Sequence, residues 1–330
     1  MQRPAFLITI DTEGDNLWAR PREITTENAA FLSRFQELCE TYKFKPAYLT
    51  NWEMAAAPVF QEFGRDVIRR GTGEIGMHPH AWNSPPLDSL TDDDFTHLPF
   101  LTEYPEGQMR DKIRALTDKL ETTFGVKMHS HRAGRWGFNE VYARILSEMG
   151  YLVDCSVTPH VSWRSMRGDP RGTGGPDFTR FPSEAYFLDL DDISRAGRSR
   201  LLELPVTIIK RQWPATVETL RRFSERLAKG RRGMERIFPV LQWLRPDGTN
   251  RDALLSVLNT ALAEKRDYVE FMLHSSEFMP GGSPIFSTPE SIEALYDDVE
   301  AVFSVAAGHF AGLTLAEYYQ RFRGYVKKCG

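Results

Sequence analysis

The chain has 330 residues and a formal net charge of −4 at pH 7. This length suits one large α/β domain or two small ones, and the weak charge argues against a nucleic-acid-binding protein. The three cysteines, Cys39, Cys155 and Cys329, are widely spaced, so neither a disulfide framework nor a thiolate zinc site is expected. With no apolar leader after Met1 and no run near the ~20 apolar residues of a membrane span, we expect a soluble cytoplasmic protein without stable membrane insertion.

The first predicted strand, residues 6–10, runs directly into two carboxylates, Asp11 and Glu13. A continuous run of mostly apolar strand formers is typical of a strand buried on both faces. Side chains two residues apart in an extended backbone leave on the same side. Buried negative charge requires a cation, hydrogen-bond donors or water, so this strand end is a candidate site. A simple polar turn is the alternative.

Helices and strands alternate through the rest of the first half of the chain. The expected elements are, in order, a helix at 26–41, a strand at 45–49, a helix at 54–70, a strand at 74–77, a helix at 108–124, a strand at 126–132, a helix at 139–149 and a strand at 151–156. The helices are predicted from apolar residues at helical spacing, with glycines as stop signals. Alternation of this kind predicts a parallel sheet.

The second half of the chain is less regular. We expect a loop at 160–200, a strand at 200–206, an inserted helical segment at about 207–263, a strand at 267–273 and two final helices. Thr314 and Glu317 form a capping-box pattern for the last helix. Seven strand units without an obvious break favour a barrel formed by a single domain over residues 1–330, with the helical insertion before its last main strand.

Polar side chains follow five of the predicted strands. They are Asp11 and Glu13, His78 and His80, Arg132, Asp154, and His274. In α/β barrels the site lies at the face where the strands end. Two histidines and a carboxylate are a standard hydrolytic metal site, and His78 and His80, at positions i and i+2, can face the same point. The sequence therefore predicts a metal site at this face.

Five ordered motifs resemble those of the polysaccharide deacetylase family, carbohydrate esterase family four, also called the NodB-type domain. They are Thr-Ile-Asp-Thr-Glu-Gly at 9–14, Glu-Ile-Gly-Met-His-Pro-His at 74–80, His-Arg-Ala-Gly-Arg-Trp-Gly at 131–137, Asp-Cys-Ser at 154–156 and Leu-His at 273–274. The resemblance covers most of the chain. It implies a distorted (β/α)7 TIM-like barrel and a metal-dependent carbohydrate N-deacetylase.

The resemblance also implies a role for each matched residue. Asp11 would be the general base, Arg132 would hold it ionised, and His274 would be the general acid. The implied ligands of a divalent metal, zinc with cobalt or manganese as alternatives, are Glu13, His78 and His80. The implied substrate contacts are Trp82, Trp136, Asp154 and Ser156. A strand-end ion pair for Arg132 and a turn anchor for Asp154 remain the structural alternatives.

The chain departs from the usual family pattern at two motifs. The family usually has adjacent aspartates, whereas Thr12 separates Asp11 from Glu13. Its histidines are usually four residues apart, whereas His78 and His80 are two apart. Trp82 stands where the second histidine would fall. This chain looks like a His-x-His-x-Trp subgroup associated with surface-glycan biosynthesis.

The expected function is therefore removal of an N-acetyl group from an acetylated sugar or glycan precursor in surface-polysaccharide biosynthesis. A catalytically inactive carbohydrate-binding relative and another metal-dependent C–N amide hydrolase on the same fold are the alternatives. The basic stretch of the insertion, residues 210–236, is either a solvated face or a site for an anionic partner such as a nucleotide diphosphate, a lipid-linked pyrophosphate or a membrane surface.

Overall fold

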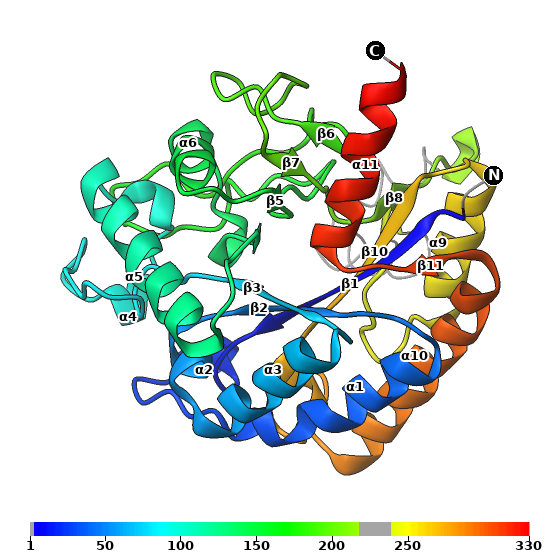
Figure 1. Cartoon of the computed structure of the whole chain (residues 1–330), viewed down its shortest axis with the longest axis horizontal. Coiled ribbons are helices and arrows are strands. Elements are labelled where there is room, and N and C mark those ends of the chain that lie inside the picture. The colour runs from blue at the N-terminus through cyan, green and yellow to red at the C-terminus, as the bar shows by residue number, and fades with distance from the viewer. Residues whose placement is uncertain (1–2, 218–238, 330) are drawn as a thin grey trace.

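A nine-stranded sheet curls into a half-barrel surrounded by helices (Figure 1). The computed structural model describes residues 3–217 and 239–329. The strand order is β10-β1-β2-β3-β4-β5-β7-β6, with β11 also paired to β1. The strands of this sheet are β1 (Ala5–Thr12), β2 (Ala47–Thr50), β3 (Glu74–Met77), β4 (Ser130–His131), β5 (Val153–Asp154), β6 (Tyr186–Phe187), β7 (Leu202–Glu203), β10 (Tyr268–His274) and β11 (Ala311–Gly312). Apart from the antiparallel pair β6–β7 the neighbours are parallel, so the predicted distorted barrel is confirmed.

Most helices pack on the outside of the curled sheet, whereas α11 packs against its inner side (Figure 1). The α-helices are α1 (Leu32–Thr41), α2 (Trp52–Ala56), α3 (Pro58–Arg70), α4 (Asp94–His97), α5 (Glu106–Phe124), α6 (Glu140–Glu148), α9 (Arg251–Ala263), α10 (Pro289–His309) and α11 (Leu315–Cys329). The 3-10 helices are η1 (Leu17–Ala19), η2 (Glu27–Phe31), η3 (Leu101–Glu103), η4 (Gly134–Trp136) and η5 (Ser275–Phe278). The capping box of α11 is confirmed: Glu317 N donates to Thr314 Oγ1 and Thr314 N to Glu317 Oε2. Within the described ranges, no helix has the length and apolar composition of a membrane span.

Alternation along β1 and β10 decides which side chains face the barrel interior. In β1, Phe6, Ile8 and Ile10 belong to the large core beneath the outer helices, whereas Ala5 and Leu7 belong to a separate inner cluster with Tyr318 of α11. Thr9 and Asp11 share the parity of Leu7 and therefore face inward. In β10 the inward-facing series is Tyr268, Glu270, Met272 and His274, by the same rule.

Among the described residues the sheet does not close into a full barrel, because its order ends at β10 on one side and at β6, the partner of β7, on the other. The segment after β7 nevertheless runs beside β10. Thr207 Oγ1 accepts a hydrogen bond from Glu270 N at 2.8 Å, and Tyr268 OH donates to Pro205 O at 2.7 Å. Side chains, together with backbone hydrogen bonds through Leu244 (Leu244 N to Thr207 O at 3.1 Å and Met272 N to Leu244 O at 3.3 Å), thus hold the two edges together.

The segment at 207–263 differs in part from the expected helical insertion. It contains β8 (Ile208–Lys210) and β9 (Leu241–Trp243), which pair antiparallel in a separate two-stranded sheet, and it ends with α9. Ile208 and Ile209 are buried β-branched residues, which favour a strand. Of the insertion's arginines, Arg211 donates to Gln242 Oε1 and Ser256 Oγ. Arg221, Arg222, Arg226, Arg231, Arg232 and Arg236 lie outside the described residues.

Candidate active site

A cavity of about 350 Å³ opens at the face where the strands end. Its polar and aromatic lining residues are Asp11, Glu13, Trp18, Arg20, His78, His80, Trp82, Arg135, Trp136, Trp163, Arg245 and His274. They come from the ends of β1, β3 and β10, from η1 and η4, and from the segments that follow η1, β5 and β9. Because β1 pairs with β10 and Asp11 is opposite His274 in register, residues 263 positions apart in the chain face one cavity.

Three buried side chains in this cavity form a set of metal donors. Glu13, His78 and His80 bring one ligand atom each to within 4.8 Å of one another. Glu13 Oε2 lies 2.8 Å from His80 Nε2 and 3.5 Å from His78 Nε2. These separations bracket the ~3.3 Å expected between ligands on a tetrahedral Zn²⁺ with bonds of ~2.0–2.1 Å. The donor set therefore fits a divalent ion such as Zn²⁺.

The backbone of β4 orients one of these histidines. His78 Nδ1 lies 3.0 Å from the carbonyl oxygen of Arg132. A carbonyl can only accept, so Nδ1 carries the proton and Nε2 is left as a lone-pair donor that faces Glu13. Metal-ligating histidines are commonly fixed in this way by a hydrogen bond on the other ring nitrogen.

The surrounding groups favour the metal-binding protonation states of Glu13 and His80, but not that of His78. Burial raises the pKa of Glu13, but His274, His78 and His80 outweigh burial and hold that pKa well below its usual range. Burial lowers the pKa of His80, which favours its neutral form. Burial also lowers the pKa of His78, but Asp11 and Glu13 outweigh this and raise it. A cation at this place would thus compete with a proton on His78.

Asp11 is held as an anion by a buried arginine. Burial raises the pKa of Asp11, but Arg132, His78 and His274 outweigh burial and lower it. Arg132 Nη1 donates to Asp11 Oδ1 at 2.6 Å, and the other carboxylate oxygen, Oδ2, lies 3.7 Å from His274 Nε2 and 3.9 Å from His78 Nε2. One oxygen is therefore occupied by Arg132, while the other remains among the histidines.

Arg132 is fully buried and is bonded along its whole guanidinium. Nε donates to Cys155 O at 3.0 Å, and Nη2 donates to Thr9 Oγ1 at 2.8 Å and to Glu270. Burial raises the pKa of Glu270 to about 7 although Arg132 lowers it. Glu270 was not predicted, but it is the only charged residue in an otherwise uncharged run of β10 from Tyr268 to Leu273, and a buried charge of that kind requires a partner.

Removing Arg132 should destabilise the fold strongly. Arg132→Met leaves Asp11 and Glu270 buried without their counter-ion, and breaking a buried pair in this way costs about 3–5 kcal/mol. Denaturant unfolding of the variant measures the loss. Arg22→Met is the control, because it removes an exposed ion pair with Asp93 and should cost far less. A similar free energy of unfolding for both variants would contradict the account.

His274 lies within a cluster that was only partly predicted. Its Nε2 is 3.7 Å from Asp11 Oδ2 and 3.8 Å from Glu13 Oε1. On the other side of the ring, Arg245 Nη2 lies 3.1 Å from His274 Nδ1 and donates to Glu277 Oε1 at 2.9 Å. Glu277 Oε2 accepts from His274 N at 2.8 Å and lies 3.3 Å from Nδ1. Arg245 and Glu277 thus hold the imidazole by Nδ1 and direct Nε2 into the cavity.

Aromatic rings form much of the remaining wall. Trp82 packs against His80 with ring centroids 4.4 Å apart, and Trp18 packs edge-on against His274 at 4.9 Å. Trp136 stacks on Trp163 at 6.3 Å with planes 12° apart. All four rings line the cavity, among them Trp82 and Trp136, the predicted substrate contacts. Ring faces of this kind can stack on the apolar faces of sugars.

The structure places neither Asp154 nor Ser156 in the cavity. Val153 and Cys155 belong to the inner cluster, so strand alternation directs their neighbour Asp154 outward. Asp154 Oδ1 accepts from His131 Nδ1 at 2.5 Å and from Ser156 Oγ at 2.8 Å, and Ser156 Oγ accepts from Ala133 N at 2.8 Å. Both residues therefore support the backbone on either side of Arg132.

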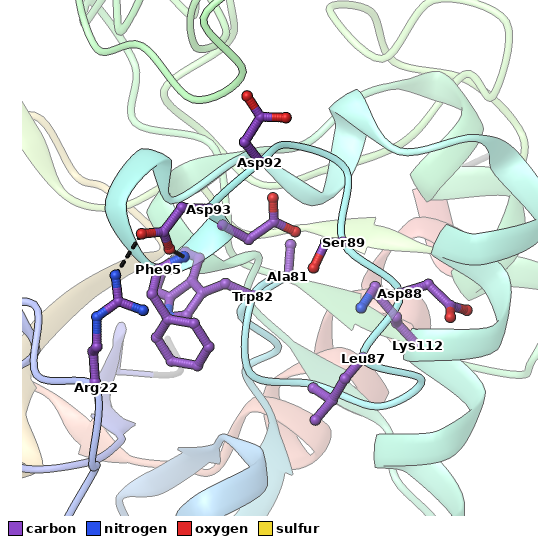
Figure 2. A pocket seen from close by; sticks show the side chains of 11 residues that line it. Arg22, Ala81, Trp82, Leu87, Asp88, Ser89, Asp92, Asp93, Phe95 and Lys112 are labelled. Carbon is purple, nitrogen blue, oxygen red and sulfur yellow. Dashed lines mark hydrogen bonds and ion pairs between the residues drawn. The ribbon is translucent and has the colours of Figure 1, made fainter.

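A second, smaller cavity of about 280 Å³ is shown in Figure 2. It shares Trp82 with the first, and its lining includes a run of acidic residues near α4 together with Arg22 and Lys112. In this run Asp93 is paired with Arg22 at 2.5 Å (Figure 2), and Asp94 accepts hydrogen bonds from Thr91 and Tyr104. Asp93 and Asp94 therefore stabilise the loop to which they belong.

Comparisons with known proteins identify the fold. No family model matches the sequence, and no curated protein matches it. A Mycobacterium smegmatis protein described as a polysaccharide deacetylase has a similar structure, with a TM-score of 0.53 and 15% identity over 98% of this chain and 92% of that one. A Parabacteroides distasonis protein described as a glycoside hydrolase or deacetylase has a TM-score of 0.62 and 9% identity over 98% and 72%.

A third solved structure is an enzyme of another kind. The 4-alpha-glucanotransferase from Thermococcus litoralis matches with a TM-score of 0.52 and 15% identity, over 97% of this chain but 40% of its own. At such identities these likenesses bear on the fold alone. Together with the order of β1 to β10 and the five motifs, they show that the chain has the polysaccharide deacetylase fold.

Proposed function

We propose that the chain is a metal-dependent carbohydrate N-deacetylase that hydrolyses the acetamide of an acetylated amino sugar in a surface polysaccharide or glycan precursor. It acts as one domain over residues 1–330, with an insertion at about 207–263. A single observation carries the proposal. A buried set of metal donors (Glu13, His78 and His80) lies between an arginine-bound carboxylate, Asp11, and a histidine, His274, in one aromatic-walled cavity.

The proposed mechanism divides the proton transfers between two residues. Asp11 is ionised and its Oδ2 is not bonded to Arg132, so it accepts the proton of the attacking water as general base. His274 faces the same space through Nε2 and donates a proton to the leaving amine as general acid. Arg132 holds Asp11 ionised, while Arg245 and Glu277 hold His274 in position.

Beside the two proton-transfer residues, the set of metal donors fits a divalent ion. Glu13, His78 and His80 would hold it, and when bound it supplies a Lewis acid that acidifies water and polarises the amide carbonyl. Zn²⁺ suits two imidazoles and a carboxylate, and Co²⁺ or Mn²⁺ are the alternatives. The aromatic wall would exclude bulk water and position the sugar ring beside these groups.

A substrate panel tests the proposal. Purified protein supplied with Zn²⁺ is incubated with N-acetyl, N-formyl and N-propionyl derivatives of the same amino sugars and with simple cyclic amides. We expect acetate and free amine to appear in equal amounts from acetylated sugars. Preferential release of formate, or opening of a cyclic amide, would assign a different C–N hydrolase. Tight sugar binding without any hydrolysis would indicate a carbohydrate-binding relative.

A further inference from the structure

Two arginines on the wall of the catalytic cavity have no carboxylate partner among the described residues. Arg20 and Arg135 line the cavity together with Arg245, but only Arg245 forms an ion pair there, with Glu277 at 2.9 Å. By contrast, Arg22, two residues after Arg20, is paired with Asp93 at 2.5 Å. Two unneutralised cations thus face the space that a substrate would enter.

Both guanidiniums donate to backbone carbonyls of residues 96–98, and Arg135 also donates to a carbonyl of a second segment. Arg20 Nη1 donates to Thr96 O at 2.9 Å, and Arg135 donates to Leu98 O through Nη1 and to Arg167 O at 3.0 Å through Nη2. A guanidinium has five N–H donors, so these contacts leave most donors of Arg20 and several of Arg135 available. Carbonyl partners orient the charge and do not neutralise it.

The two charges also act on each other. Burial lowers the pKa of Arg135 to about 10, Glu103 raises it, and Arg20 lowers it further. Glu103 forms no ion pair with Arg135, and its Oε2 instead accepts from Phe100 N and Asp169 N. Bringing two like charges together beside a cavity is unfavourable unless an anion joins them.

The backbone at these positions is strained. Arg20 and Arg135 have φ values of 54°, and the neighbouring lining residues Leu98 and Trp136 have φ values of 50° and 63°. Left-handed conformations are unfavourable for side chains other than glycine and cluster at ligand sites, where the surrounding structure enforces them. Four such residues border this one cavity, so its wall is built to hold these side chains in place.

We propose that Arg20 and Arg135 bind an oxyanion carried by the substrate, so that the acetylated sugar is a phosphorylated or carboxylated one. This rests on the proposed function, because it names the substrate class of the same cavity. The acetamide would lie at Asp11 and His274, while the phosphoryl or carboxylate group would lie at the arginine side of the wall. Arginine suits this role because its planar donors match phosphate and carboxylate oxygens.

Binding measurements on the metal-free protein test the proposal, since an anion cannot then be held by a bound metal. The probes for calorimetry are N-acetylglucosamine, its 1-phosphate and its 6-carboxylate (the uronic acid). We expect at least one anionic probe to bind about tenfold or more tighter than the neutral sugar. This preference should shrink as salt is raised, because Arg20 is exposed and Arg135 is only half-buried.

Variants separate recognition from a purely structural role. Arg20→Gln and Arg135→Gln should each weaken binding of the anionic probe about tenfold, a change of ~1.4 kcal/mol, and leave the neutral probe unchanged. Arg135→Lys should keep part of the preference. Arg22→Gln is the matched control: it removes the same charge from the same loop, but Arg22 is paired with Asp93 and lies outside the catalytic cavity (Figure 2). If the Arg135→Gln variant does not fold, the Arg20→Gln variant tests the proposal by itself, because Arg20 is exposed.

The outcomes distinguish this inference from the proposed function. Equal binding of neutral and anionic sugars, or an equal loss for both probes in the Arg20 and Arg135 variants, would overturn oxyanion recognition and leave both arginines as anchors of residues 96–98. Acetate release by the metal-loaded protein is scored separately. Anion preference without acetate release would remove the deacetylase proposal alone, whereas release without anion preference would remove the oxyanion proposal alone.

Discussion

Asp11→Asn should retain bound metal and slow acetate release by about 10³- to 10⁴-fold. Asparagine preserves the shape of the side chain and can still meet Arg132, but it cannot accept a proton from water. Because the donor set consists of Glu13, His78 and His80, metal content should stay near that of the unmodified protein. Elemental analysis and an acetate assay on the same sample measure both quantities.

The opposite pattern is expected for His78→Ala. That change deletes a ligand whose other ring nitrogen is already anchored on Arg132 O, so metal and activity should be lost together. His160→Ala is the matched control, since His160 pairs with Ser183 and is not among the residues that line the cavity. If Asp11→Asn strips the metal instead, Asp11 is a ligand and the assignment of Glu13 is wrong.

His274→Ala should lower turnover by about 10²- to 10⁴-fold without changing metal content or folding. The imidazole directs Nε2 toward Asp11 and Glu13 at 3.7 and 3.8 Å and is not part of the donor set. Its proposed task is to protonate the leaving amine. Kinetics on an acetylated amino sugar, with metal content and melting temperature measured alongside, check this expectation.

The leaving group provides the internal control for His274. An activated aryl acetate releases a good leaving group that needs no proton, so the loss caused by His274→Ala should shrink on this substrate. A variant equally impaired on both substrates would indicate that His274 binds or positions the substrate and does not act as an acid.

Much of the site could be predicted because the burial of a strand and the direction of its side chains follow from the local sequence. The apolar run ending in Asp11 identified a buried strand, and spacing by two placed Asp11 and Glu13 on one side. The neighbouring position of the first and last main strands brought His274 opposite Asp11, as the register shows. The same parity rule, applied to β5, would have directed Asp154 away from the cavity, because Val153 and Cys155 take the inner positions.

Other parts of the site depend on contacts that no local pattern encodes. Arg245 reaches His274 from a loop 29 residues upstream, and Trp18 covers His274 from a single 3-10 turn. Neither lies in a periodic segment. Arg20 and Arg135 meet at one cavity because both bind carbonyls of residues 96–98, which is a tertiary feature. The β8–β9 pair lies in the segment at 207–263, which was expected to be helical.

Metal reconstitution tests the central claim most directly. The protein is purified without affinity-tag metal, analysed for elements, stripped with a chelator and then supplied with Zn²⁺, Co²⁺ or Mn²⁺ while acetate release from an acetylated amino sugar is followed. We expect about one divalent ion per chain, loss of activity on stripping, and recovery on adding one of these ions. A protein that holds no stoichiometric metal and gains no activity from any of them would contradict the assignment of Glu13, His78 and His80 as a catalytic metal site.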